Sequence, residues 1–274
     1  MIRLEDNDDW LLLTHKDHAA LAGEFARHWK NQDFSPPEPF AHILDAVSRH
    51  DDSWAVPDAT PNLSPEGAPA AFSKELVGTY DAFEDIDLEA YLSVRSNATE
   101  DAALRDPYAA VLISMHTVNL LTDQADLSTL NEEELAIHGR FIEGQLQRQH
   151  QLKESLRAQP DFERFVSEKD FLRGFQFLQA CDSFSLFAGV DFKDKGALRH
   201  AQPTRNGVNV SIELTPLGDR CFQLSPWPLD EPTIHFSVPY KRIPKSATRD
   251  LQSFRAAYSA AEIEIQRNTV TASS

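Results

Sequence analysis

The chain has 274 residues, of which 41% are hydrophobic and 25% charged, as in an ordinary globular protein. Its 43 acidic residues outnumber its 26 basic residues, which gives a formal net charge of −17. Nucleic acids and anionic membranes are bound through clustered lysines and arginines, so this charge argues against both as partners. A small phosphorylated molecule in a local basic pocket remains compatible with it.

Two features of the sequence bear on the compartment. Cys181 and Cys221 form neither a CxxC pair nor a zinc-ribbon spacing, and they are typical of reduced cytosolic thiols. The acidic start of the chain does not resemble a secretion signal, and no apolar run approaches the length of a membrane span. We therefore expect a cytoplasmic protein.

Up to residue 200 the sequence carries mainly helical patterns. An extended lead-in precedes a helix capped by Thr14. A second helix is predicted to start with Pro36 at its first position and to end at the sequence HDDSW, residues 50–54. A proline-rich loop follows at 55–73. Later apolar periodicities predict helices over about 81–96, 107–124, 128–159 and 161–189.

After residue 200 the pattern changes to short alternating segments punctuated by glycine and proline. A final amphipathic helix is predicted at about 247–267. The predicted fold class is therefore mainly α, a helical bundle core with a small C-terminal antiparallel β-sheet and a final helix. We expect residues 1–200 and 201–274 to pack as parts of one structural unit. The strands of the predicted sheet are near 207–214, 220–224 and 233–239.

Polar side chains interrupt the apolar faces of four of the predicted helices. Burying an unpaired carboxylate costs several kcal/mol, so such groups are normally paired or bound to a metal. Taken singly, each histidine is read as a hydrogen-bonded core residue and each aspartate as a helix cap or a backbone acceptor. Taken together, their imidazoles and carboxylates favour a divalent metal, Mn, Fe, Zn or Mg. The residues are His18, His50, Asp51, His116 and Asp182.

The order of these residues resembles the HD superfamily of metal-dependent phosphohydrolases. His18 lies on an early helix, the adjacent pair His50 and Asp51 ends the next helix, and Asp182 lies on a late one. The resemblance implies an HD-like helical core in which these four side chains bind the metal. His116 resembles the additional histidines with which some members bind a second ion.

A closer resemblance, covering nearly the whole chain, is to an uncharacterised bacterial family that brings no established activity. One departure from the HD superfamily concerns the residues after the His-Asp pair. They are commonly small or apolar there, whereas Asp52 and Trp54 are found here. The motifs shared with the uncharacterised family are DHAALAG with a later tryptophan (17–29), HDDSW (50–54), SMH (114–116), DSFSL (182–186) and PWP (226–228).

The HD resemblance implies a metal-dependent hydrolase of a phosphate ester or nucleotide. Asp51, Asp52 and His116 are the candidate catalytic residues. For Asp52, three roles stay open: an acceptor behind the ligands, a ligand of a second metal, or a surface residue. The basic residues expected near the phosphate are Arg49, Lys74 and Arg173, and the spare ligand candidates are His15 and His42.

Two alternatives remain at the level of sequence. The same ligands are compatible with iron, because some HD-fold proteins are mixed-valent di-iron oxygenases. A non-catalytic module that binds a metal or another ligand is the third interpretation. The identity of the metal separates the first two, and turnover of any substrate separates both from the third.

Overall fold

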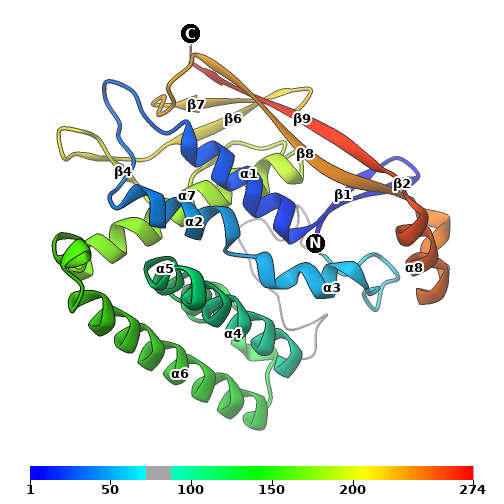
Figure 1. The fold of residues 1–274 in the computed structure, drawn as a ribbon. Coiled ribbons are helices and arrows are strands. Elements are labelled where there is room, and N and C mark those ends of the chain that lie inside the picture. Colours follow the sequence, from blue (N-terminus) through cyan, green and yellow to red (C-terminus); the bar gives the residue numbers. More distant parts are fainter. Residues whose placement is uncertain (72–87, 274) are drawn as a thin grey trace.

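A strongly curved β-sheet lies over a layer of helices (Figure 1). The structure is a computed structural model that describes residues 1–71 and 88–273. Helices α1 and α7 lie directly beneath the sheet, and α1 packs against α2 as well. Helix α5 packs against α2 and α7 on one side and against α4 and α6 on the other. The main hydrophobic core fills the space between the sheet and these helices.

Within the described residues, seven strands form the sheet in the order β1-β2-β8-β9-β7-β6-β3. Neighbouring strands are antiparallel except β7 and β9, which are parallel. The alternation in β8 explains how the sheet covers the helices, because Ile234, Phe236 and Val238 are buried and the residues between them are exposed. The strands are β1 (Ile2–Asp6), β2 (Asp9–Leu13), β3 (Gly196–Ala197), β6 (Glu213–Gly218), β7 (Cys221–Ser225), β8 (Thr233–Pro244) and β9 (Ile263–Ala272). A separate pair comprises β4 (Gln202–Pro203) and β5 (Asn209–Val210).

The helices begin where their sequences offer caps. Thr14 accepts a hydrogen bond from the backbone of Asp17, as predicted, and Ser167 forms a capping box with Asp170 at the start of α7. The helix predicted to start at Pro36 begins instead at Phe40. The described helices are α1 (His15–Arg27), α2 (Phe40–Arg49), α3 (Ala55–Ala59), α4 (Leu88–Arg105), α5 (Pro107–Asn119), α6 (Glu132–Arg157), α7 (Glu168–Gly189) and α8 (Leu251–Ala260).

The prediction of a mainly α fold with a small C-terminal sheet is wrong. Strands β1 and β2, from the start of the chain, belong to the same sheet as the late strands, because β2 pairs with β8. The three expected strands do not form a simple antiparallel series either, since β9 lies between β7 and β8. The sheet is large and mixed, and it joins the two ends of the chain.

The predicted final helix at 247–267 is wrong in its second half. Helix α8 ends at Ala260, and the chain continues as strand β9. In β9 the buried residues Gln266, Asn268 and Val270 alternate with more exposed ones, and isoleucine, threonine and valine are frequent. Alternation and β-branched residues favour a strand over a helix, and this explains the correction.

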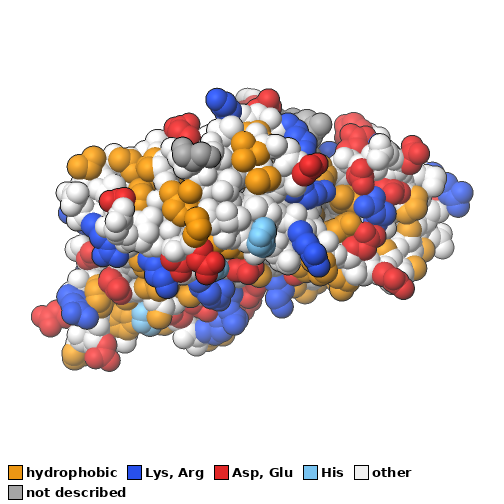
Figure 2. Space-filling view, turned by 90° about the horizontal axis from the view of Figure 1, so that it is seen from above, with side chains coloured by type: hydrophobic (Ala, Val, Ile, Leu, Met, Phe, Trp, Pro, Cys, Tyr) orange, Lys and Arg blue, Asp and Glu red, His pale blue; other side chains and the backbone are white. Residues whose placement is uncertain are grey.

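Two further observations concern the distribution of charged side chains and the absence of membrane-spanning helices among the described residues. Across the face seen in Figure 2, acidic and basic side chains are interspersed with apolar ones. In the part of the chain that the structure describes, no helix has both the length and the apolar character needed to cross a bilayer.

Candidate metal centre

Three helices bring four buried polar residues to one point, which we call the central cluster: His18, His50, Asp51 and Asp182. His18 lies on α1, one turn after the Thr14 cap at the end of β2. His50 and Asp51 directly follow α2, where the chain turns into a short 3-10 segment (Asp52–Trp54). Asp182 lies on α7. All four are at most 7% exposed.

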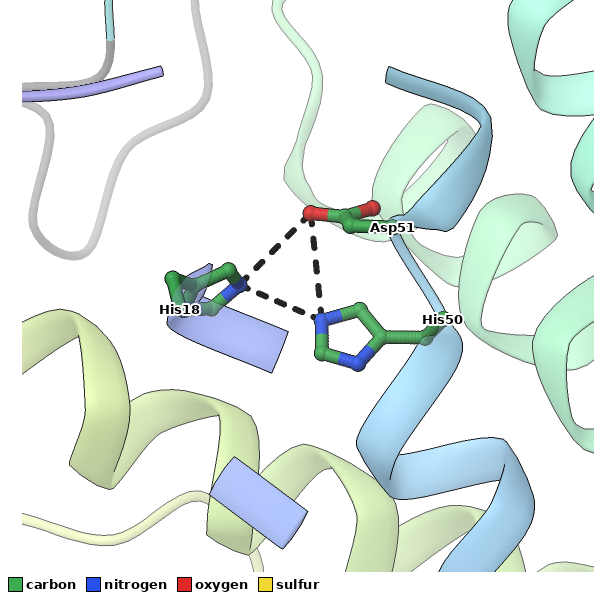
Figure 3. Close-up of side chains that lie close together, drawn as sticks. All are labelled: His18, His50 and Asp51. Carbon is green, nitrogen blue, oxygen red and sulfur yellow. Dashed lines mark hydrogen bonds and ion pairs between the residues drawn. The ribbon is translucent and has the colours of Figure 1, made fainter. Parts of the chain in front are cut away.

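The atoms that face one another in the central cluster are ligand atoms. Nε2 of His18 lies 3.2 Å from Nε2 of His50, 3.2 Å from Oδ1 of Asp182 and 3.5 Å from Oδ2 of Asp51. Nε2 of His50 lies 3.3 Å and 3.8 Å from the same two carboxylate oxygens. Figure 3 shows the convergence of His18, His50 and Asp51. Ligands that share one ion at about 2.1 Å in a tetrahedral arrangement are about 3.4 Å apart, which fits these distances.

The other ring nitrogen of each histidine is held from outside the central cluster. Nδ1 of His50 donates to the carbonyl of Val47, at 2.9 Å. Ser185 donates its hydroxyl to the carbonyl of Asp182, so its oxygen accepts from Nδ1 of His18, at 2.7 Å. In the neutral state both rings therefore carry their hydrogen on Nδ1 and direct the lone pair of Nε2 inward. Such outer hydrogen bonds are usual for histidines that bind metals.

Asp51 is held by a buried arginine. Nη1 of Arg95, on α4, donates to Oδ1 of Asp51 at 2.8 Å, and Nε of Arg95 donates to the hydroxyl of Tyr91 at 3.0 Å. The guanidinium also lies over the ring of Trp54, 5.4 Å from its centre. Because Arg95 occupies Oδ1, the other oxygen of Asp51 is the one directed at His18.

The charges of the central cluster favour a cation at its centre. Burial lowers the pKa of His18, but the hydrogen bonds and charges of Asp182 and Asp51 outweigh burial and raise this pKa to about 9. Burial would raise the pKa of Asp51, yet the charges of Arg95 and His50 hold it well below its usual range. Asp182 behaves alike, through His18 and His50. Two ionised carboxylates therefore face one guanidinium, and a proton or a metal ion supplies the second positive charge.

His116, on α5, lies beside the central cluster. Its ring centre is 5.2 Å from that of His50, and burial lowers its pKa to about 3, so the ring is neutral at ordinary pH. One ligand atom each from His50, His116 and Asp182 lie within 4.8 Å of one another, as do those of His18, His50 and Asp51. The His and Asp groups are thus close enough to hold a metal ion.

The predicted substrate-binding and spare residues that the structure describes have their partners or positions outside the central cluster. Arg49 pairs with Asp45 at 3.2 Å and with Asp52 at 3.8 Å on the half-exposed end of α2. Asp52, a predicted catalytic residue, is thus the partner of a surface arginine. Arg173 is exposed on α7, nine residues before Asp182 and so about 13 Å away along the helix. Lys74 lies outside the described residues. Of the spare ligand candidates, His15 pairs with Asp58 and His42 with Asp106.

Sequence reasoning missed the residues that hold the side chains of the central cluster, above all Arg95. A signal for it exists: Leu88, Tyr91, Leu92 and Arg95 follow helical spacing and all are buried. An arginine on an otherwise apolar face requires an acidic partner. Nothing comparable marks Ser185, whose role depends on the rotation of α7 relative to α1.

The fold and the central cluster define a sheet-over-helix protein with a buried histidine–carboxylate centre. The chain belongs to the family described as protein of unknown function DUF3891, whose profile matches residues 1–245. The expectation of an uncharacterised family is thereby confirmed. Comparison with curated proteins and with solved structures finds no match.

Proposed function

We propose that the protein is a metal-dependent hydrolase of phosphate esters or nucleotides, and that His18, His50, Asp51 and Asp182 bind its divalent ion. One observation carries the proposal. Four acceptor atoms meet at one buried point, while the Nδ1 hydrogens of both histidines are engaged elsewhere. Two imidazole nitrogens and two carboxylate oxygens suit Mn, Fe or Zn, and less well Mg.

Each residue of the site has its own role in the proposed reaction. A divalent ion in this position supplies Lewis-acid chemistry, since it acidifies water and neutralises charge on phosphoryl oxygens. Asp51 and Asp182 retain a negative charge at ordinary pH, because their neighbours depress their pKa values. Arg95 keeps Asp51 oriented with one oxygen inward. His116 stands beside the central cluster as a neutral ring, and there it can donate a hydrogen bond to an anionic substrate.

The order of the residues along the chain adds support. An early histidine, a His-Asp pair at the end of the next helix and an aspartate on a late helix follow the HD pattern. The four side chains that match this pattern are also the four that meet in the central cluster. The large sheet has no counterpart in an all-helical HD core, so the resemblance concerns the site and the helices that carry it.

One observation favours a second candidate, the di-iron oxygenase. His50, His116 and Asp182 form a further group whose ligand atoms lie within 4.8 Å of one another. A di-iron centre would use this group as its second ion site, with His50 and Asp182 shared between the ions. The third interpretation, a non-catalytic binding module, requires a metal without turnover.

The test compares the wild type with Asp51→Asn, purified without added metal. Elemental analysis measures the bound ion, and a panel of nucleotides and phosphate esters measures turnover. Asp51→Asn keeps the size of the side chain and removes its charge, so we expect both the metal and the turnover to be lost. Asp101→Asn, the same change on the exposed side of α4, is the matched control and should retain both.

Each alternative gives a different result. An Asp51→Asn protein that keeps metal and turnover would remove Asp51 from the mechanism. Two iron atoms per chain and oxygen-dependent turnover would favour the oxygenase. Bound metal in the wild type without turnover of any substrate in the panel would favour the binding module.

A further inference from the structure

The hydrogen bonds around His116 start from a short π-helical turn after α5, Leu120–Gln124. Such turns are rare and occur frequently at functional sites. Nδ2 of Asn119 donates to the carboxylate of Asp123, at 2.6 Å. Because a carboxylate only accepts, this bond fixes the orientation of the Asn119 amide, and its oxygen Oδ1 must point the other way.

The fixed amide of Asn119 in turn orients Gln179, which is fully buried on α7, three residues before Asp182. Nε2 of Gln179 donates to Oδ1 of Asn119 at 2.7 Å, and Oε1 of Gln179 accepts from Nε2 of His200 at 2.5 Å. The second hydrogen on Nε2 of Gln179 then faces Nδ1 of His116, at 3.4 Å. Gln179 therefore donates to His116.

The consequence for His116 is a defined tautomer. A neutral imidazole has one N–H and one lone pair. The lone pair is on Nδ1, where it accepts from Gln179, so the hydrogen is on Nε2. Within residues 1–71 and 88–273, no hydrogen bond reaches Nε2 of His116. In this tautomer neither nitrogen of His116 has a free lone pair for a metal, and its Nε2–H has no partner among these described residues.

We propose that Gln179 is a positioning residue that holds His116 as its Nε2–H tautomer. His116 then acts as a hydrogen-bond donor to an anionic oxygen of the ligand, and the centre takes one metal ion. The number of ions rests on the proposed function, whereas the tautomer does not. The central cluster also supplies all four ligands of one ion without His116, and a second ion would have to share His50 and Asp182 with the first.

The test is nuclear magnetic resonance of the imidazole nitrogens in ¹⁵N-histidine-labelled protein. The signals of His116 are assigned from their loss in His116→Gln. In the metal-free wild type we expect a protonated Nε2 and an unprotonated Nδ1. Addition of Zn²⁺, which is diamagnetic, should shift the ¹⁵N signals of Nε2 of His18 and of His50. In His116, Nε2 should stay protonated and Nδ1 unprotonated.

Two variants of α7 test the role of Gln179. Gln179→Glu replaces the donor by an acceptor of nearly equal size, so the hydrogen of His116 should move to Nδ1. The freed lone pair of Nε2 should then respond to Zn²⁺. Gln176→Glu places the same charge at a half-buried position about one turn earlier on the same helix and should leave the wild-type tautomer unchanged.

The outcomes separate this inference from the proposed function. A hydrogen on Nδ1 of His116 in the wild type would overturn the inference. A change in the protonation of either His116 nitrogen when Zn²⁺ is added to the wild type would overturn it as well. Retention of the Nε2 hydrogen in Gln179→Glu would remove Gln179 from the role. If Zn²⁺ shifts neither His18 nor His50, the proposed metal site fails, although the tautomer measured without metal still stands.

Discussion

Two histidine–aspartate groups are built around His15 and His18, which lie one turn apart on α1, and they differ in how their charges are balanced. In the first, the central cluster, acceptor atoms face one another. In the second, Asp58 accepts from the backbone of His15 at 2.6 Å and from the amino group of Met1 at 3.0 Å, while Nδ1 of His15 lies 2.6 Å from that amino group and 3.0 Å from Asp58. The ring of His15 also stacks on Trp54. The backbone N–H of His15 and the amino group of Met1 thus both donate to Asp58.

The comparison shows that buried His and Asp residues do not by themselves identify a metal site. Asp58 has its cation and its donors built into the protein, and these contacts hold its pKa below the usual range despite burial. The central cluster has one guanidinium for two carboxylates, and its His and Asp groups are close enough to hold a metal ion. The balance of donors and acceptors, which the sequence does not display, distinguishes the two.

The largest expected effect on stability comes from replacing Asp58. Asp58→Asn removes the charge that faces His15 and the amino group of Met1, and we expect a loss of about 3 kcal/mol in the free energy of unfolding. Urea denaturation should give the same loss with EDTA and with added metal. Asp230→Asn, which affects the exposed pair with His28, is the control and should cost less than about 1 kcal/mol. A loss at Asp58 that depended on metal would mean that the two groups are coupled.

A pH dependence should mark the central cluster in metal-free protein. The pKa of His18 is about 9 in the folded state and about 6.5 in the unfolded chain. A raised folded pKa means that the stabilisation is complete below about pH 6.5 and is lost as the pH rises through 9. The loss amounts to about 3 kcal/mol in urea denaturation with EDTA. Bound metal should abolish it, since His18 then holds no proton. A free energy of unfolding that does not change over this pH range in EDTA would contradict the raised pKa of His18.

A smaller effect is expected from Arg95→Lys. Lysine keeps the positive charge, but it lacks the planar group that bonds Asp51 and Tyr91 together and lies over Trp54. The affinity for the metal should fall about tenfold, as measured by competition with a chelating dye. Arg148→Lys, in the exposed pair with Glu100, is the matched control and should leave affinity unchanged. Equal affinities for both variants would show that Arg95 does not position Asp51.

The smallest effect is expected at Arg49, the residue that sequence reasoning assigned to the phosphate. Its ion pairs are half-exposed, so Arg49→Ala should change the free energy of unfolding by no more than about 0.5 kcal/mol. Bound metal and the KM for any substrate that is found should also stay the same. A marked rise in KM would restore Arg49 to the substrate site.

The four residues of the central cluster were predictable because each interrupts a helical pattern locally. His18 and Asp182 stand on apolar faces within their own helices, and His50 and Asp51 continue the face of α2. Such a pattern needs no knowledge of the partner helix. The tautomers and the orientation of Asp51 depend on contacts between distant segments, such as Ser185 with His18, and periodicity carries no information about those.

The sheet was underestimated for a similar reason. Strand β2 was recognised as an extended segment, but its pairing with β8 joins residues more than 200 positions apart. Pairing of this kind depends on packing against the partner strand rather than on local preference. Strand β9 was read as the continuation of a helix because Ile263 and Ile265, its large apolar residues, are exposed, whereas Gln266 and Asn268 are buried. Over residues 263–268 two isoleucines are thus exposed and two amide side chains buried, the reverse of what pattern reading expects.

Strand β9 also has a consequence for the order of events during synthesis. It alone connects the β1-β2-β8 part of the sheet with the β7-β6-β3 part, and Nε2 of Gln266 bonds to the end of α7 at the carbonyl of Ala188. Until residues 263–272 have emerged from the ribosome, these two parts of the sheet are therefore unconnected. The helices α1 and α7, which carry His18 and Asp182, are covered by one continuous sheet only after residues 263–272 emerge. The proposed metal site should accordingly be completed only after strand β9 is made, well after translation of the helices that carry its residues.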